Sequence, residues 1–159
     1  MIGDIRNPRL MLLSVTLVAL VLSAVPLPHV LDLLRPDFVL LTIIWFALML
    51  PRAGGLAAAW LAGLALDAFH GVVLGENALA FVVVAFLVHR FHLRMRMYPL
   101  SQQALVVLVL LLLYQFLLFW IDGVTGHPAN AWFRWLPVLT GALLWPVLTG
   151  FLGRIMTRS

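Results

Sequence analysis

Six apolar stretches separated by short loops make up most of this 159-residue chain. They raise its hydrophobic content to 64%, whereas charged residues contribute only 10%, far less than a water-soluble surface requires. Inside a bilayer every backbone amide must be hydrogen bonded within the protein, which excludes open sheet edges. We therefore predict an all-α membrane protein with six transmembrane helices. These helices are expected to cover residues 10–25, 38–50, 54–69, 78–88, 100–121 and 136–152.

The ten arginines, in a chain without lysine, predict how these helices are oriented. If every stretch crosses the membrane, eight arginines fall on one side, and only Arg35 and Arg134 fall on the other. Positively charged loops resist translocation, so the arginine-rich side should be cytoplasmic, and both termini should lie there. The eight cytoplasmic arginines would be Arg6, Arg9, Arg52, Arg90, Arg94, Arg96, Arg154 and Arg158.

Six spans in 159 residues leave only short loops, so residues 1–159 are predicted to form a single polytopic transmembrane domain. The formal charge of +4 does not indicate nucleic-acid binding, because the arginines flank apolar segments and do not form a patch. The densest group, Arg90, Arg94 and Arg96, is a predicted cytoplasmic basic segment. We expect it to contact anionic lipid or, alternatively, a cytoplasmic protein.

Small side chains recur at every fourth position of the third stretch, at Gly55, Ala59 and Gly63. On a helix this spacing places them on one face, where a second helix can approach closely. We favour internal packing of the bundle as the use of this strip. The alternative is a docking face for the transmembrane helix of a partner.

Asp67 continues the same row near the outer end of the third stretch. A charged side chain within a span costs about 2.5–3.5 kcal/mol at mid-bilayer, so it is expected to face protein or water. Arg35 lies on the same side of the predicted membrane and is the expected charged partner of Asp67. The two are therefore predicted to form a structural polar pair, and Gln115 could donate a hydrogen bond across the bundle.

No group of residues forms a recognisable reaction centre. Asp67 and Asp122 could meet as the carboxylate pair of an intramembrane protease, but neither lies in a catalytic signature. His89 and His92 have the one-turn spacing of a metal pair, yet the arginines around them would repel a divalent cation. We expect no enzymatic activity, no bound metal and no cofactor.

Several short motifs occur in a specific order along nearly the whole chain. They are Arg35-Pro36-Asp37 before the second stretch, Gly63-Leu-Ala-Leu-Asp67 in the third, Gly71-Val-Val-Leu-Gly75 after it, Gln102-Gln103-Ala104 opening the fifth, and Leu144-Trp145-Pro146 in the sixth. Each motif is weak alone. Their order and spacing together resemble the MreD family of bacterial rod shape-determining membrane proteins.

This resemblance implies a non-catalytic scaffold in the bacterial inner membrane, within the elongation complex that inserts lateral-wall peptidoglycan. The implied partners are MreC, through its transmembrane helix, and also MreB, RodA and a class B penicillin-binding protein. The MreC helix is expected to dock against the face that carries Gly55, Ala59 and Gly63.

The resemblance also implies an alternative function. The family is related in fold to the six-helix substrate-binding components of energy-coupling-factor transporters. A protein of that type would bind a small molecule in an outward-facing pocket. Asp67, Glu76, Asn77 and Asp122 could line such a pocket.

Overall fold

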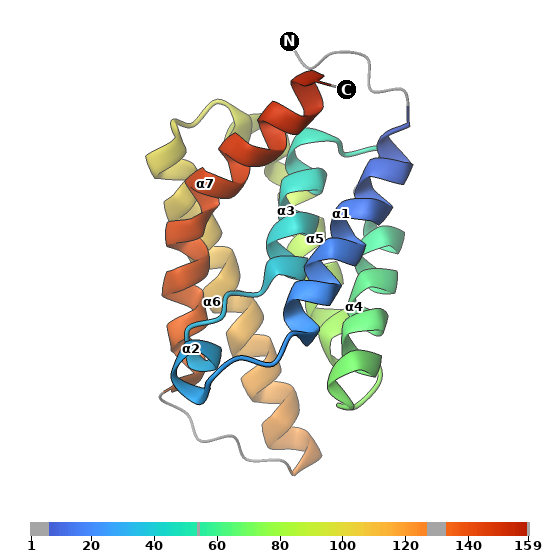
Figure 1. Cartoon of the computed structure of the whole chain (residues 1–159), viewed down its shortest axis with the longest axis vertical. Coiled ribbons are helices and arrows are strands. Elements are labelled where there is room, and N and C mark those ends of the chain that lie inside the picture. Colours follow the sequence, from blue (N-terminus) through green and yellow to red (C-terminus); the bar gives the residue numbers. More distant parts are fainter. Residues whose placement is uncertain (1–6, 54, 127–132, 159) are drawn as a thin grey trace.

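Six long helices run side by side along the length of the molecule, within residues 7–53, 55–126 and 133–158 that the computed structural model describes (Figure 1). Two short helices, α2 and η1, lie in the connections before α3 and before α7. The described residues contain no strand. The helices are α1 (Pro8–Ala24), α2 (His29–Leu33), α3 (Phe38–Met49), α4 (Leu56–His70), α5 (Glu76–Arg96), α6 (Leu100–Thr125), η1 (Phe133–Trp135) and α7 (Leu136–Arg158).

Helix α3 lies inside the bundle and is enclosed by its neighbours. Ten consecutive side chains, from Val39 to Leu48, are buried, and α3 contacts α1, α4, α5 and α7. A helix that is hydrophobic on all sides is stable only when it is surrounded. Its 12 residues extend about 18 Å, less than the ~30 Å hydrocarbon core, so the surrounding helices must shield its ends.

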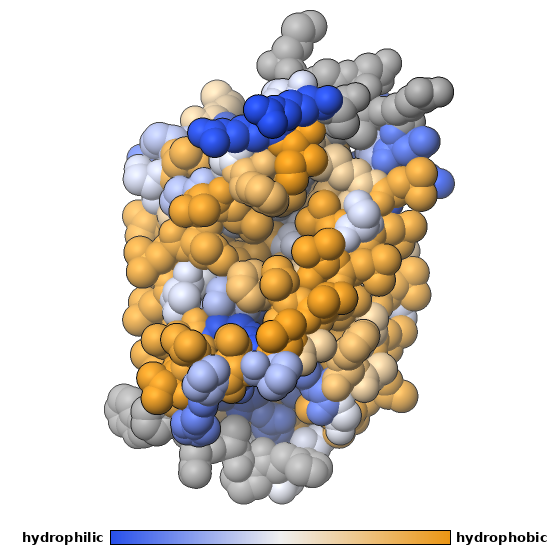
Figure 2. Space-filling view, viewed as in Figure 1, coloured by the Kyte–Doolittle hydropathy of each residue, from blue (hydrophilic) through white to orange (hydrophobic). Residues whose placement is uncertain are grey.

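The outer surfaces of the bundle are apolar, the reverse of a soluble protein. On α7, for example, Leu139, Leu143 and Val147 are 57%, 79% and 65% exposed. Figure 2 shows apolar side chains over the middle of the visible face and hydrophilic ones gathered toward its two ends. Such a surface is stable where lipid, and not water, surrounds it.

Helices α5, α6 and α7 are each long and apolar enough to cross a membrane, whereas α1 and α4 are apolar but shorter. Among the described residues, α5, α6 and α7 are the helices that meet both criteria of length and apolar composition. The prediction of an all-α membrane protein is confirmed, and each predicted stretch corresponds to one of the helices α1, α3, α4, α5, α6 and α7. Six crossings, and the cytoplasmic position of both termini, remain a prediction.

Helices α4 and α5 form a closely packed hairpin whose turn runs from Gly71 to Gly75. Both glycines have positive φ values, 65° and 101°, which other residues rarely adopt. A Cβ atom on Gly63 would lie 2.4 Å from Ala78 Cα, so α4 can approach α5 this closely only because residue 63 is glycine. Ala59, one turn away, is also fully buried.

The predicted small-residue strip therefore does not offer a continuous outer face. Gly63 and Ala59 face the interior, whereas a Cβ atom on Gly55 would meet no atom within 4 Å. A partner helix cannot reach Gly63 while α5 occupies that position. Gly63 and Ala59 thus pack internally, the favoured use of this strip, and docking of MreC on it stays an untested expectation.

Candidate functional site

Asp67, near the end of α4, is fully buried and accepts three hydrogen bonds. The backbone N–H of Gly75 donates to its Oδ2 at 2.9 Å, and the backbone N–H and the side-chain amide of Asn77 donate to its Oδ1 at 2.9 and 2.7 Å. Two of these donors are backbone amides at the start of α5, where the helix has no internal acceptors and its dipole favours an anion. Asp67 therefore caps α5 from the neighbouring helix. The three hydrogen bonds offset the cost of removing its carboxylate from water.

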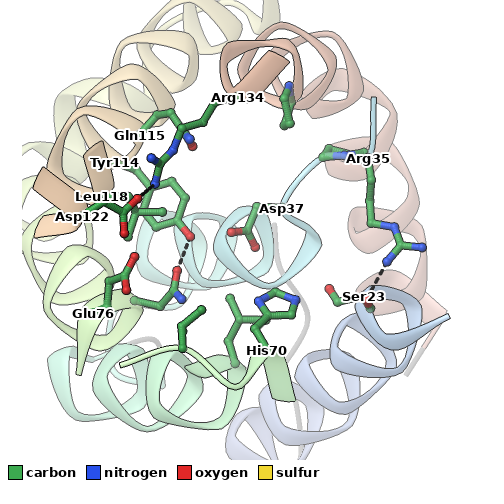
Figure 3. A pocket seen from close by; sticks show the side chains of 15 residues that line it. Ser23, Arg35, Asp37, His70, Glu76, Tyr114, Gln115, Leu118, Asp122 and Arg134 are labelled. Carbon is green, nitrogen blue, oxygen red and sulfur yellow. Dashed lines mark hydrogen bonds and ion pairs between the residues drawn. The ribbon is translucent and has the colours of Figure 1, made fainter. Parts of the chain in front are cut away.

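Tyr114 extends this network to α6. Its hydroxyl donates a hydrogen bond to Asn77 Oδ1, drawn as a dashed line in Figure 3. Tyr114 is 5% exposed, and its ring also packs against Phe81 of α5 at 5.6 Å between centroids. Asp67, Asn77 and Tyr114 thus connect α4, α5 and α6 through one buried chain of hydrogen bonds.

A cavity of about 380 Å³ opens beside this network, between the ends of α3, α4, α5, α6 and α7 (Figure 3). We call it the polar pocket. Asn77 and Tyr114 line it, whereas Asp67 lies outside its lining. Its ionisable and amide side chains are Arg35, Asp37, His70, Glu76, Asn77, Tyr114, Gln115, Asp122 and Arg134. Glu76, Asn77 and Asp122, three of the four residues expected to line an outward pocket, are among them.

An ion pair between Arg134 and Asp122 closes one side of the polar pocket. The two side chains are only 14% and 16% exposed, so both charges are largely withdrawn from water. The pair joins the end of α6 to η1, which precedes α7.

Arg35 is held on the opposite side of the polar pocket and points away from its centre (Figure 3). Its guanidinium donates to the backbone oxygens of Ser23 and Val25, and its Nε lies 3.5 Å from Asp32 Oδ1. Arg35 therefore fixes the connection between α1 and α2.

The structure does not bring together the predicted pair of Arg35 and Asp67. Each is satisfied locally: Asp67 by amides of the α4–α5 turn and the start of α5, and Arg35 by carbonyl groups at the end of α1. A carboxylate accepts hydrogen bonds from backbone N–H groups as readily as from the N–H groups of a guanidinium. The sequence shows only side-chain types and therefore favoured the charged partner.

Asp37 begins α3 and also lines the polar pocket. Its Oδ1 accepts a hydrogen bond from the backbone N–H of Leu40 at 3.1 Å, as an N-cap side chain does. Burial raises the pKa of Asp37 above its ordinary value, whereas the Leu40 amide, which stabilises the charged form, partly opposes this rise. Asp37 is therefore a cap whose charge is costly.

The basic segment lies at the opposite end of the bundle, at the end of α5. Arg96 donates from Nε to the backbone oxygen of Leu48 at 2.7 Å, and from its NH2 group to that of Met49. These are the last carbonyls of α3. No N–H group of the helix donates to them, and the helix dipole at this end favours a cation. All three arginines are exposed, so the hydrogen bonds to α3, and not burial, distinguish Arg96. Arg96 thus has a structural task that the other two do not share.

The described residues contain no group of three His, Asp or Glu side chains placed to hold a metal ion. His92 Nδ1 lies 2.6 Å from the backbone oxygen of His89, so this nitrogen is engaged within its own helix. The polar pocket holds Asp122 but not Asp67, so the two carboxylates weighed as a protease pair do not share it.

An all-helical bundle with an apolar exterior, a buried polar network at one end and arginines at the other defines a membrane-embedded helical protein. The chain matches the family of rod shape-determining protein MreD over residues 4–155. It belongs to that family, as its motifs indicated, and the family assigns it a role in rod shape determination.

A curated relative supports the same assignment. The chain is 28% identical over 138 residues to the rod shape-determining protein MreD of Haemophilus influenzae. The similarity covers 85% of this chain and 83% of the relative. No solved structure matches the chain.

Proposed function

We propose that this protein is a non-catalytic scaffold of the cell-elongation machinery in the bacterial inner membrane. In this proposal it crosses the membrane six times, binds the transmembrane helix of MreC, and so supports the synthesis of lateral-wall peptidoglycan. Membership of the MreD family carries the proposal. MreB, RodA and a class B penicillin-binding protein are proposed as further members of the same assembly.

The buried polar groups hold helices together, which supports the proposal that the protein is a scaffold. Asp67, Asn77 and Tyr114 join three helices to one another, and Arg96 caps α3. A catalytic acid or base must instead reach a substrate, so it cannot be fully engaged in holding helices together. Structure-supporting polar networks of this kind fix one arrangement of the bundle and hence one outer surface.

The exposed surface offers two stripes long enough for a partner that crosses the membrane. On α7, exposed apolar side chains recur every four residues from Leu139 to Ile155. On α6 a similar stripe runs from Leu105 to Trp120. Each stripe extends about 22–24 Å, most of the ~30 Å hydrocarbon core. We propose that MreC packs on one of these stripes and not on the strip that contains Gly63.

Disulfide crosslinking tests this proposal directly, because the chain has no native cysteine. Single cysteines at Leu112 on α6 and Leu143 on α7 sample the two stripes, and a cysteine at the buried Ala59 is the matched control. We expect crosslinks to a cysteine in the MreC helix from one stripe and none from Ala59. Lack of crosslinks from both stripes, with MreC present in the same membranes, would contradict the proposed docking face.

The polar pocket favours a second candidate, a small-molecule-binding component of an energy-coupling-factor-type transporter. Its volume of about 380 Å³ lies within the range of small-ligand sites, and it combines carboxylates, amides and two arginines. Native mass spectrometry of the purified protein separates the two functions. A stoichiometric small molecule retained without MreC would favour the transporter component, whereas co-purified MreC without such a molecule would favour the scaffold.

A further inference from the structure

A second cavity, larger than the polar pocket, opens on the side of the bundle between α1 and α4. Its volume is about 580 Å³. We call it the α1/α4 groove. Leu13, Leu17 and Leu20 of α1 form one wall, and Ile43 of α3 contributes to its lining. Ala58, Ala62 and Ala65 are among the α4 residues that form the other wall.

The groove exists because α4 presents small side chains opposite the leucines of α1. Alanine methyl groups do not fill the space between the two helices, and both helices also contact α3. A void in a protein interior loses dispersion contacts on every side. In a membrane the groove opens toward lipid tails, so hydrocarbon of suitable shape gains contacts by entering it.

The polar atoms of the groove lie mainly at one end. Arg9 and Arg52 line it there, at the end predicted to be cytoplasmic, and none of the described residues that line it is acidic. Among the residues that the structure describes, neither guanidinium forms an ion pair. Deeper in the groove, the hydroxyl oxygen of Thr16 is buried without a hydrogen-bond partner. An occupant that carries an anionic group and acceptor oxygens would complement both features.

The length of the groove distinguishes a lipid from a helix. Its lining along α1 runs from Arg9 to Leu20, and eleven helical rises correspond to about 16 Å. This is half of the ~30 Å hydrocarbon core, the depth of one leaflet. A helix that crosses the membrane needs a surface that covers most of the hydrocarbon depth, as the stripes of α6 and α7 do at about 22–24 Å and the groove does not.

We propose that the α1/α4 groove binds an anionic phospholipid of the cytoplasmic leaflet. An acyl chain lies between the leucines of α1 and the alanines of α4, and Arg9 and Arg52 bind the phosphate group. The proposal depends on the predicted orientation of the bundle but not on the binding of MreC. It assigns two of the eight arginines on the cytoplasmic side to a ligand as well as to topology.

Native mass spectrometry with added phosphatidylglycerol, compared with phosphatidylcholine of the same acyl chains, tests the charge preference. We expect the wild-type chain to bind phosphatidylglycerol about tenfold more tightly, because each basic side chain near an anionic headgroup contributes to affinity. The Arg9→Gln/Arg52→Gln variant should lose this preference. The matched control, Arg154→Gln/Arg158→Gln, removes the same charge outside the groove and should keep it. Equal loss in both variants, or no preference in the wild type, would overturn the proposal.

A second variant tests the apolar part of the groove. Ala58→Leu adds three carbon atoms to its wall and should weaken the binding of both lipids at least about threefold. Circular dichroism checks that the variant is folded, and the arginine variants carry the test if it is not. If Ala58→Leu abolished MreC binding and left lipid binding unchanged, the occupant would be a protein helix and the proposal would be wrong.

Discussion

Gly63 of α4 lies directly against the backbone of Ala78 in α5, so closely that a Cβ atom on Gly63 would sit 2.4 Å from Ala78 Cα. The same hairpin carries Asp67, whose carboxylate caps α5 through Asn77. The contact and the cap lie about one helical turn apart and have complementary effects. Close approach brings the carboxylate within reach of the α5 amides, and the hydrogen bonds then hold the two helices together.

Gly63→Leu should therefore unfold or strongly destabilise the bundle. No flexible side chain can move aside, because the nearest atoms are backbone atoms of α5. Overpacking usually costs about 1–3 kcal/mol, and a clash with backbone falls at or above the upper end. Gly150→Leu is the matched control, since a Cβ atom there would meet nothing within 4 Å. Thermal unfolding in detergent measures both, and equal melting temperatures would refute the close contact.

Asp67→Ala should lower the melting temperature more than Asp122→Ala. Removal of the Asp67 carboxylate leaves three donors without their acceptor in a buried site, at about 1–3 kcal/mol for each unsatisfied group. Among the described residues Asp122 has one ion-pair partner, Arg134, and water still reaches part of both side chains. The comparison uses the two purified variants in one detergent, and melting temperatures within a degree of each other would contradict this account of Asp67.

Asp37 predicts a stability effect that depends on pH. Its pKa is raised above 3.8 in the folded protein, so folding favours the protonated form. The contribution of Asp37 is most favourable below pH 3.8 and is lost as pH rises through the raised folded value. Asp37→Asn keeps a capping oxygen without the charge. It should match or exceed the wild-type melting temperature at pH 7, and this advantage should shrink at pH 4.

Asp37→Ala is the matched control for that experiment. It removes both the charge and the N-cap, which contributes about 0.5–2 kcal/mol to a helix. At pH 7 the alanine variant should be less stable than the asparagine variant. If the two variants melted together, the hydrogen bond to Leu40 would contribute nothing measurable.

The basic segment predicts a difference between neighbouring arginines. Arg96→Gln should destabilise the bundle, because Arg96 hydrogen-bonds the last carbonyls of α3, whereas Arg90→Gln should leave its stability nearly unchanged. Arg90 is exposed and serves only orientation or lipid contact in this account. Melting curves of the two charge-matched variants decide the point, and a larger loss for Arg90→Gln would be the contrary result.

The sequence predicted the long helices well because an apolar run must be hydrogen bonded within itself in lipid. The predicted ends of the helices were least accurate where a helix extends beyond the apolar run. Helix α5 was expected over residues 78–88 but continues to Arg96. Charged side chains end the apolar run there, but they do not prevent the helix from continuing. The short helix α2 was not predicted, because its five residues are too few to show a period.

The polar network was predicted only in part. The cost of a carboxylate within a span identified Asp67, but its partners are an amide side chain and backbone groups, which no pattern of charges reveals. Tyr114 was missed within a long aliphatic stretch. Its hydroxyl was the available signal, because a buried tyrosine requires a hydrogen-bond partner.

The most direct test of the scaffold is affinity purification of the full chain from membranes that contain MreC, followed by mass spectrometry of all bound proteins and small molecules. We expect MreC to co-purify with the wild type and with Arg90→Gln, which leaves the bundle intact. Purification of a folded protein without MreC, from membranes in which MreC is abundant, would contradict it.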